Sequence, residues 1–84
     1  MSYRPWLEVS ALGQMGGMPD EALDALAERL ARICADPYDR MLSMPVSADN
    51  PAERMAELGD AGFIEFRVDE DNGLVRVYSF VWTG

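Results

Sequence analysis

Hydrophobic and polar residues alternate along two segments near the end of the chain. The alternation runs over residues 63–69 and resumes from Leu74 to Trp82. A period of two is typical of β-strands that bury one face. Between the two segments lies Asn72-Gly73, a dipeptide that favours a two-residue type I′ turn. The pattern therefore predicts one antiparallel hairpin over residues 62–84.

A type I′ turn at this position would fix which residues of the hairpin face each other. The pairs on the face expected to be buried are Val68 with Val77, Phe66 with Ser79, and Ile64 with Val81. The pairs on the reverse face are Asp69 with Arg76, Arg67 with Tyr78, Glu65 with Phe80, and Phe63 with Trp82. The reverse face would thus present four aromatic side chains to water, namely those of Phe63, Tyr78, Phe80 and Trp82. Because a single sheet leaves such a face uncovered, we predict that these residues bind a partner, unless another part of the chain covers them.

A helical period dominates the first half of the chain. Apolar residues recur at three- and four-residue intervals from Leu23 to Cys34, which predicts an amphipathic helix with one buried stripe. Pro19 suits the first helical position, and Asp36-Pro37 ends the helix. Cys34 lies on the stripe, so we expect a buried, unreactive thiol.

The remaining segments have weaker patterns. Residues 3–9 predict a short edge strand, because Pro5 lacks a backbone donor, and residues 10–15 predict a short helix. Residues 38–51 show no period and predict an irregular connection. Residues 50–59 carry both helix-terminating signals and a strand-like alternation, so both a short helix and a third sheet strand remain open.

Charge restricts the chemistry that is open to this chain. The sequence has 15 acidic and 7 basic residues, no histidine, and a net charge of −8. Such a surface repels phosphate backbones, so we expect no direct DNA binding and disfavour RNA. A zinc site built from cysteine and histidine is excluded, and we expect no metal and no other cofactor. Any acid or base would have to be a carboxyl group or a tyrosine.

Length and hydropathy bound the organisation of the protein. Residues 1–84 are enough for a single domain, and 49% of them are hydrophobic, as in globular proteins. No apolar run approaches the ~20 residues that a membrane span needs, and the start lacks an apolar signal segment. We therefore expect a cytoplasmic protein that does not associate with a membrane.

Several short motifs, taken in order, resemble those of the RelE/ParE toxin superfamily. They are the Tyr3-Arg4 strand, Ala11-Leu12-Gly13-Gln14-Met15 before Met18-Pro19, Ala35-Asp36-Pro37-Tyr38, Gly59 to Gly62, the Phe66-Arg67-Val68-Asp69 strand, and Leu74-Val75-Arg76-Val77-Tyr78. These motifs run through most of the chain, and their order and spacing carry the resemblance. It implies a bacterial α+β protein with a small antiparallel sheet of three to four strands and with one long and one short helix packed on one face. It also implies an antitoxin as partner.

The resemblance also indicates where a catalytic site would lie. Some members of the superfamily cleave messenger RNA on the ribosome, and others block DNA gyrase. The cleaving members use basic residues on the strand before the hairpin, an arginine where the hairpin begins, and an arginine with a tyrosine or histidine after its last strand. Here the first position offers only Arg54, the second falls on Phe63 or Ile64, and the third falls beyond Gly84. Since cleavage needs fixed cations around the phosphate, we expect no active nuclease of this type.

Three functions remain as hypotheses. The first is a toxin-like protein of a type II toxin–antitoxin module that acts by binding a protein. The second is a ribosome-dependent messenger RNA endonuclease with an atypical site, for which the candidate residues are Arg54, Arg67 and Tyr78, which would lie near one another on the sheet if the third strand exists. The third is a degenerate binding or regulatory subunit, or a self-associating structural protein. A homodimer is a further expected assembly, whereas the identity of the target is not encoded in any motif.

Overall fold

A mixed five-stranded sheet carries the described part of the chain, in the order β1-β5-β4-β3-β2. The computed structural model describes residues 2–59 and 62–82. The strands are β1 (Arg4–Leu7), β2 (Ser43–Ser47), β3 (Asn50–Glu57), β4 (Gly62–Asp69) and β5 (Leu74–Trp82), and the helices are α1 (Val9–Met15) and α2 (Asp20–Ala35). Strand β1 runs parallel to β5, and the other neighbours are antiparallel. The predicted α+β class is confirmed, with five strands where three to four were expected.

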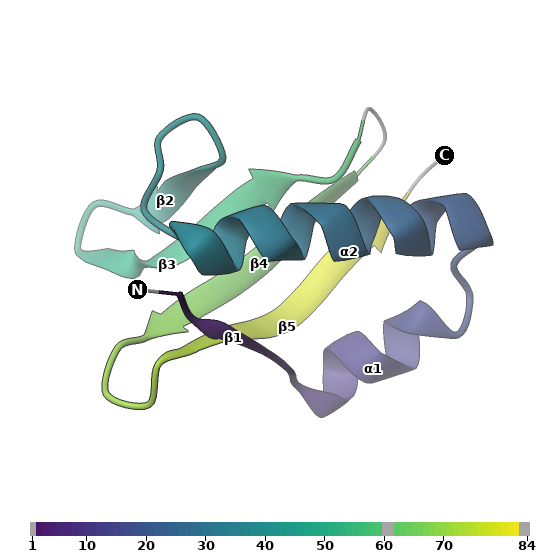
Figure 1. The fold of residues 1–84 in the computed structure, drawn as a ribbon, viewed down its shortest axis with the longest axis horizontal. Coiled ribbons are helices and arrows are strands. Elements are labelled where there is room, and N and C mark those ends of the chain that lie inside the picture. Colours follow the sequence, from purple (N-terminus) through teal and green to yellow (C-terminus); the bar gives the residue numbers. More distant parts are fainter. Residues whose placement is uncertain (1, 60–61, 83–84) are drawn as a thin grey trace.

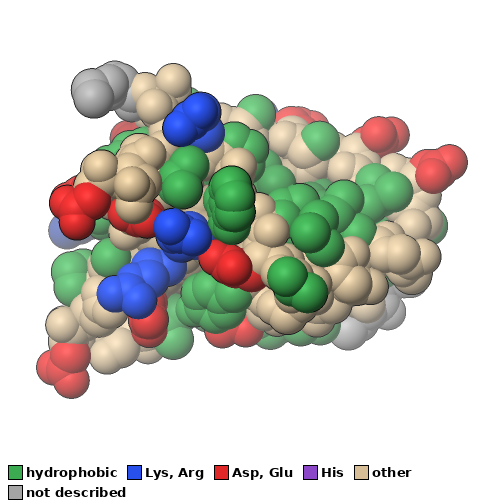
Figure 2. Space-filling view, turned by 90° about the horizontal axis from the view of Figure 1, so that it is seen from below, with side chains coloured by type: hydrophobic (Ala, Val, Ile, Leu, Met, Phe, Trp, Pro, Cys, Tyr) green, Lys and Arg blue, Asp and Glu red, His purple; other side chains and the backbone are tan. Residues whose placement is uncertain are grey.

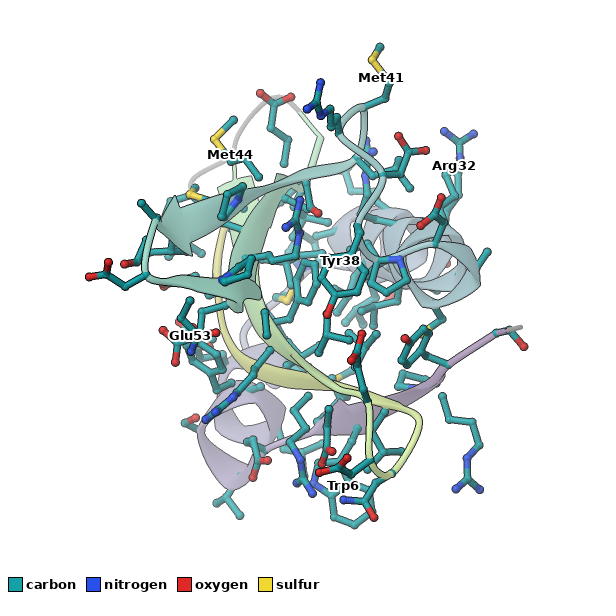
Figure 3. The ribbon with its side chains drawn as sticks, turned by 90° about the vertical axis from the view of Figure 1, so that its left-hand side faces the viewer. Trp6, Arg32, Tyr38, Met41, Met44 and Glu53 are labelled. Carbon is teal, nitrogen blue, oxygen red and sulfur yellow. The ribbon has the colours of Figure 1, made fainter. Side chains whose placement is uncertain are left out.

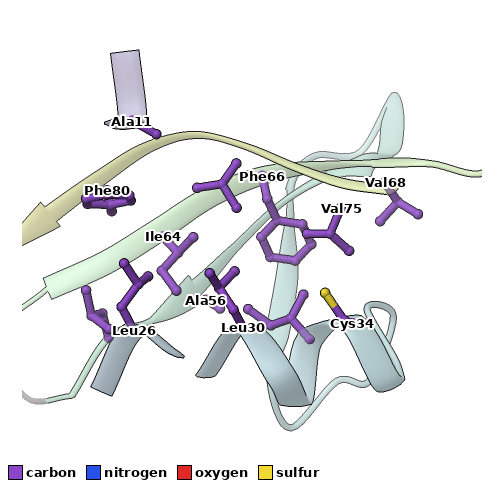
Figure 4. Packing of buried hydrophobic residues seen from close by; sticks show 13 residues of the cluster. Ala11, Leu26, Leu30, Cys34, Ala56, Ile64, Phe66, Val68, Val75 and Phe80 are labelled. Carbon is purple, nitrogen blue, oxygen red and sulfur yellow. The ribbon is translucent and has the colours of Figure 1, made fainter. Parts of the chain in front are cut away.

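Helix α2 lies across one face of the sheet and encloses the core (Figure 1). Its buried stripe includes Leu26, Leu30 and Ile33, which pack against the inward face of the hairpin strands. Phe66 is the largest fully buried side chain of the core (Figure 4). Pro19 precedes the helix, with Asp20 and Glu21 in its first turn, where carboxylates favour the positive end of the helix dipole. The helix predicted from sequence is confirmed, and Cys34 is buried in the core as expected.

The predicted hairpin exists, but its predicted register is wrong. Strand β4 pairs with β5 through Asp69 and Leu74, so Val68 faces Val75 rather than Val77. Asn72, like every other described residue except glycine, has a negative φ, which excludes a type I′ turn. The loop instead runs from residue 70 to residue 73, and it closes where Gly73 adopts a φ of 65°.

Side-chain hydrogen bonds explain why the longer loop is preferred. Oδ1 of Asp69 accepts from the backbone N–H of Asn72 at 3.2 Å, and its Oδ2 accepts from Nδ2 of Asn72 at 3.0 Å. A carboxylate that satisfies the loop backbone in this way stabilises a turn that the Asn-Gly dipeptide alone does not specify. The register is therefore set by Asp69 as well as by the glycine.

A bulge then changes which side chains of β5 point into the core. The register shifts between Phe66 with Val77 and Glu65 with Ser79, so Tyr78 is the extra residue. Beyond this bulge Phe80 faces the helix side and is 3% exposed. The predicted aromatic face is consequently wrong as a set, because Phe80 and Trp82 lie on the core side, away from the other face of the sheet.

Helix α1 stabilises the bulged half of β5, beside which β1 has already ended. Oγ of Ser10 donates to the carbonyl oxygen of Tyr78 at 2.6 Å, and the N–H of Phe80 donates to Oε1 of Gln14 at 3.0 Å. These side chains replace the backbone partners that a neighbouring strand would supply. The short helix predicted at residues 10–15 therefore satisfies a sheet edge.

The open question at residues 50–59 is settled in favour of a strand. Residues 50–57 form β3 and pair with both β2 and β4. The prediction of an irregular connection over residues 38–51 is wrong for Ser43–Ser47, which form the edge strand β2. Backbone pairing with β4 outweighs the local helix signals, as tertiary context commonly does. Within the described residues, no helix combines the length and apolarity needed to cross a membrane.

Candidate functional site

The face of the sheet away from α2 gathers most of the polar and aromatic groups that sequence analysis singled out. We call it the open face. Its members come from the central strands and are Glu53, Met55 and Glu57 of β3, Phe63, Glu65, Arg67 and Asp69 of β4, and Arg76, Tyr78, Ser79 and Val81 of β5. Successive side chains of a strand point to opposite faces of the sheet. These residues therefore lie on the open face, because their neighbours along each strand are buried beneath α2.

Tyr78 lies in a negative environment on the open face. Burial raises the pKa of its hydroxyl, and the carboxylates of Glu53 and Glu65 raise it further, while Arg67 acts in the opposite direction. A raised tyrosine pKa keeps the phenol neutral, so it can donate a hydrogen bond but is a poor base. The same carboxylates disfavour the approach of a phosphate group.

Two arginines face each other at the hairpin end of the open face. Arg67 and Arg76 are direct cross-strand partners, which makes them the obvious anion site on the sheet. Arg76, however, is already engaged by carboxylates: its Nε donates to Asp69 at 2.9 Å and its Nη1 donates to Glu8 at 3.2 Å. These contacts raise the pKa of Arg76, the hydrogen bond to Asp69 being the main cause.

An open hollow of ≈ 390 Å³ adjoins this arginine pair. Its lining includes Arg67 and Arg76 together with Asp69, Glu70 and Asp71. Because carboxylates outnumber guanidinium groups in the lining, the hollow does not concentrate negative ligands. The local charge opposes the phosphate contacts that a nuclease would need.

Arg54 does not share this face with the other nuclease candidates. It is 5% exposed and lies on the α2 side, opposite Phe66. Its guanidinium stacks over the ring of Tyr38 at 5.2 Å. Figure 3 shows Tyr38 on the helix side of the sheet and Glu53 on the other side. The expectation that Arg54 lies near Arg67 and Tyr78 is therefore wrong, although a third strand does exist.

The predicted partner-binding residues divide between the two faces. Phe63 and Tyr78 are partly exposed on the open face, whereas Phe80 belongs to the core. Trp82 packs against the core at its edge, and its indole Nε1 is buried without a hydrogen-bond partner in the described structure. Of these four residues, only Phe63 and Tyr78 remain available as aromatic contacts for another molecule.

No motif in the sequence singles out Glu53 and Glu65 as a pair. In the sequence they are two acids among many, and only the pairing of β3 with β4 and of β4 with β5 places both near Tyr78. Their alternation with Arg54 and Arg67 is the only sequence pattern that would place them on one face of a sheet. Residues 50–59 also carry helix signals, so this pattern alone does not specify that face.

Comparison with known proteins gives a consistent answer at the level of fold. A chain of the toxin–antitoxin complex RelBE2 from Mycobacterium tuberculosis superposes with a TM-score of 0.82 at 15% identity, covering 99% of this chain and 100% of that one. The chain has the RelE fold. The free E. coli toxin RelE, as an arginine-to-alanine double mutant, gives 0.79 at 16% identity, covering 95% of this chain and 82% of that chain.

The RelE fold is matched over nearly the whole chain, despite the low identity. The archaeal RelE–RelB complex from Pyrococcus horikoshii superposes with a TM-score of 0.75 at 16% identity, covering 100% of this chain and 98% of that chain. No protein-family model matches the sequence, and no curated protein does. The fold is therefore established by structure, and the suspected RelE resemblance is confirmed at that level.

Proposed function

We propose that this RelE-fold protein is the toxin-like component of a toxin–antitoxin pair and that it acts by binding proteins rather than by cleaving RNA. The structures with the same fold support the pairing: RelE of E. coli is seen with an antitoxin RelB peptide, and the archaeal RelE is seen in complex with RelB. The antitoxin role is thus proposed by analogy of fold.

The negative charge around Tyr78 is the main support for protein binding rather than RNA cleavage. Glu53 and Glu65 flank Tyr78 on the open face and raise its pKa. A nuclease that activates a 2′-hydroxyl needs fixed cations beside the developing charge. Carboxylates at that position raise the free energy of such a transition state, so the open face is better suited to a protein ligand.

The chemistry of this face suggests the character of the partner. Phe63 offers a partly exposed aromatic ring between Glu57 and Val81, its neighbours across the two adjacent strands. The surrounding carboxylates favour a segment that carries arginine or lysine among apolar residues. We infer that the antitoxin-like partner presents a basic segment to the open face.

Induced expression in a bacterial host tests the proposal. We expect growth arrest with intact transcripts, and we expect Phe63→Glu to relieve the arrest while the protein still folds. Tyr78→Phe, which removes only the hydroxyl, should leave the arrest unchanged. Arrest with cleaved transcripts that is abolished by Tyr78→Phe would instead identify a nuclease that uses the Tyr78 hydroxyl.

The third possible outcome is that expression does not arrest growth. Absence of arrest would contradict the toxin-like role and favour the degenerate binding subunit. In that case, a short protein encoded next to this one should still be captured by the wild type and not by Phe63→Glu. Met41→Glu, at an exposed site outside the open face and away from β1 and α1, is the matched control for both experiments.

A further inference from the structure

Within residues 2–59 and 62–82, β1 is an edge strand whose outer backbone groups pair with no other strand. The N–H of Arg4 donates to the carbonyl oxygen of Gly73 at 2.9 Å, and that of Glu8 donates to the carbonyl oxygen of Val77 at 2.8 Å. Even-numbered residues of β1 therefore direct their backbone groups towards β5. Because these directions alternate along a strand, Pro5 and Leu7 direct theirs outward. An edge of this kind is a template for another strand.

Large hydrophobic side chains are exposed beside this edge. Trp6 is 51% exposed, Val9 83% and Leu12 53%, and all three lie in β1 and the adjoining α1. Figure 2 views the molecule from this side and shows hydrophobic side chains grouped next to arginines and carboxylates. Exposed apolar groups clustered along one free edge are a feature of interaction surfaces.

The charged side chains along the edge of β1 are arranged so that two copies of the chain would be complementary to each other. Arg4 and Glu8 stand two residues to either side of Trp6, so all three side chains share one face of the strand. In an antiparallel pair of identical strands centred on Trp6, the two Trp6 side chains would meet. Arg4 of each copy would then lie opposite Glu8 of the other copy.

We propose that a second copy of this chain docks antiparallel on β1, with its two-fold axis at Trp6. Oε1 of Glu8 contacts Arg76 within its own chain, which leaves the other carboxylate oxygen to face Arg4 of the second copy. Pro5 has no N–H to donate, so the backbone bonds across the axis come from Leu7 of each copy to the Pro5 carbonyl oxygen of the other. The resulting dimer is weak and depends on concentration. It does not rest on the proposed function, because it requires no antitoxin and no toxicity.

Charge reversal gives a specific test by sedimentation equilibrium of the purified chain. Arg4→Glu alone places two carboxylates opposite each other, and Glu8→Arg alone does the same with two guanidinium groups. Each variant should dimerise on the order of tenfold more weakly than the wild type. An equimolar mixture of the two restores both opposite-charge pairs, so it should form a heterodimer about as readily as the wild type forms its homodimer.

Two controls keep the test decisive. Glu21→Arg changes the same charge at the start of α2, away from the edge, and should leave association unchanged. Val9→Glu places a charge among the exposed hydrophobic side chains beside the edge without removing a core contact. It should weaken association even if a charge-reversal variant folds poorly. A wild type that stays monomeric at high micromolar concentration overturns the proposal. Association that is indifferent to all three edge variants also overturns it, because another surface would then be in use.

Discussion

Nε of Arg54 donates a hydrogen bond to Oγ of Ser43 at 2.8 Å, and both residues are buried. Nη1 of the same guanidinium donates to the carbonyl oxygen of Pro51 at 3.0 Å, and Nη2 donates to that of Ser43 at 3.2 Å. Oγ of Ser43 in turn donates to the carbonyl oxygen of Pro37 at 2.8 Å. A residue that sequence reasoning assigned to a nuclease site thus joins β3 to β2 and to the connection that follows α2.

This network predicts a stability effect of Ser43→Ala. The substitution leaves Nε of Arg54 buried without its acceptor, which should lower the free energy of unfolding by about 1–3 kcal/mol. Urea denaturation followed by circular dichroism measures the change. Ser2→Ala, at an exposed site outside this network, should change the free energy of unfolding by less than about 0.5 kcal/mol. Equal effects of both substitutions would mean that the buried network contributes nothing specific.

The two phenylalanines of the hairpin that were predicted to share one face should behave differently. Phe80→Ala removes a side chain that is 3% exposed, so it should cost about 3–5 kcal/mol of unfolding free energy. Phe63→Ala truncates a partly exposed side chain on the open face and should cost clearly less. Denaturant titration of both variants tests the face assignment, and equally small losses at both positions would favour the register predicted from sequence, which placed both side chains on the outward face.

The negative environment of Tyr78 can be measured directly. Neutralising both carboxylates with Glu53→Gln and Glu65→Gln should bring the pKa of Tyr78 closer to its ordinary value, with the part due to burial remaining. The tyrosinate absorbance, taken as the difference between each protein and its Tyr78→Phe derivative, follows this group alone. Glu57→Gln is the matched control, since Glu57 is not among the groups that shift Tyr78. An unchanged pKa in the double variant would remove the main argument against phosphate binding.

Asp69 should make stability depend on acid. Hydrogen bonds from Asn72 first, and from Arg76 second, hold the pKa of this carboxyl below its ordinary value. A lowered folded-state pKa stabilises the fold above the unfolded value of about 3.9, and this contribution is lost as pH falls through the folded-state pKa. Asp69→Asn should therefore have a lower urea midpoint than the wild type near neutral pH.

The difference in urea midpoint between the two proteins should shrink as the pH falls below the unfolded-state value of about 3.9 and through the lowered folded-state pKa, where the wild-type carboxylate becomes protonated. Asp71→Asn serves as control, because Asp71 accepts no side-chain hydrogen bond within the described structure. A difference in urea midpoint between wild type and Asp69→Asn that stays constant across this pH range would show that the charge of Asp69 does not stabilise the hairpin.

Local patterns predicted the elements whose stabilising contacts are themselves local. The apolar stripe and the flanking prolines predicted α2 nearly to its ends, and Pro5 correctly marked β1 as an edge strand. The hairpin was predicted, but its register depended on Asp69 binding the loop backbone, which the Asn-Gly signal does not encode.

The candidate site was less predictable because distant residues determine it. The bulge at Tyr78 is held by Ser10 and Gln14, more than sixty residues away in sequence. It turns Phe80 inward and leaves Tyr78 among carboxylates of neighbouring strands. A single sequence carries no signal for such long-range pairing, so the aromatic face and the location of Arg54 could not be derived from it.

The central claim is that the open face binds a protein and does not cleave RNA. Mapping of transcript 5′ ends after induced expression tests it most directly, with wild type, Phe63→Glu and Tyr78→Phe compared in parallel. The account predicts growth arrest by the wild type and by Tyr78→Phe, relief of arrest by Phe63→Glu, and no new 5′ ends in any strain. New 5′ ends that appear with the wild type and vanish with Tyr78→Phe would contradict it.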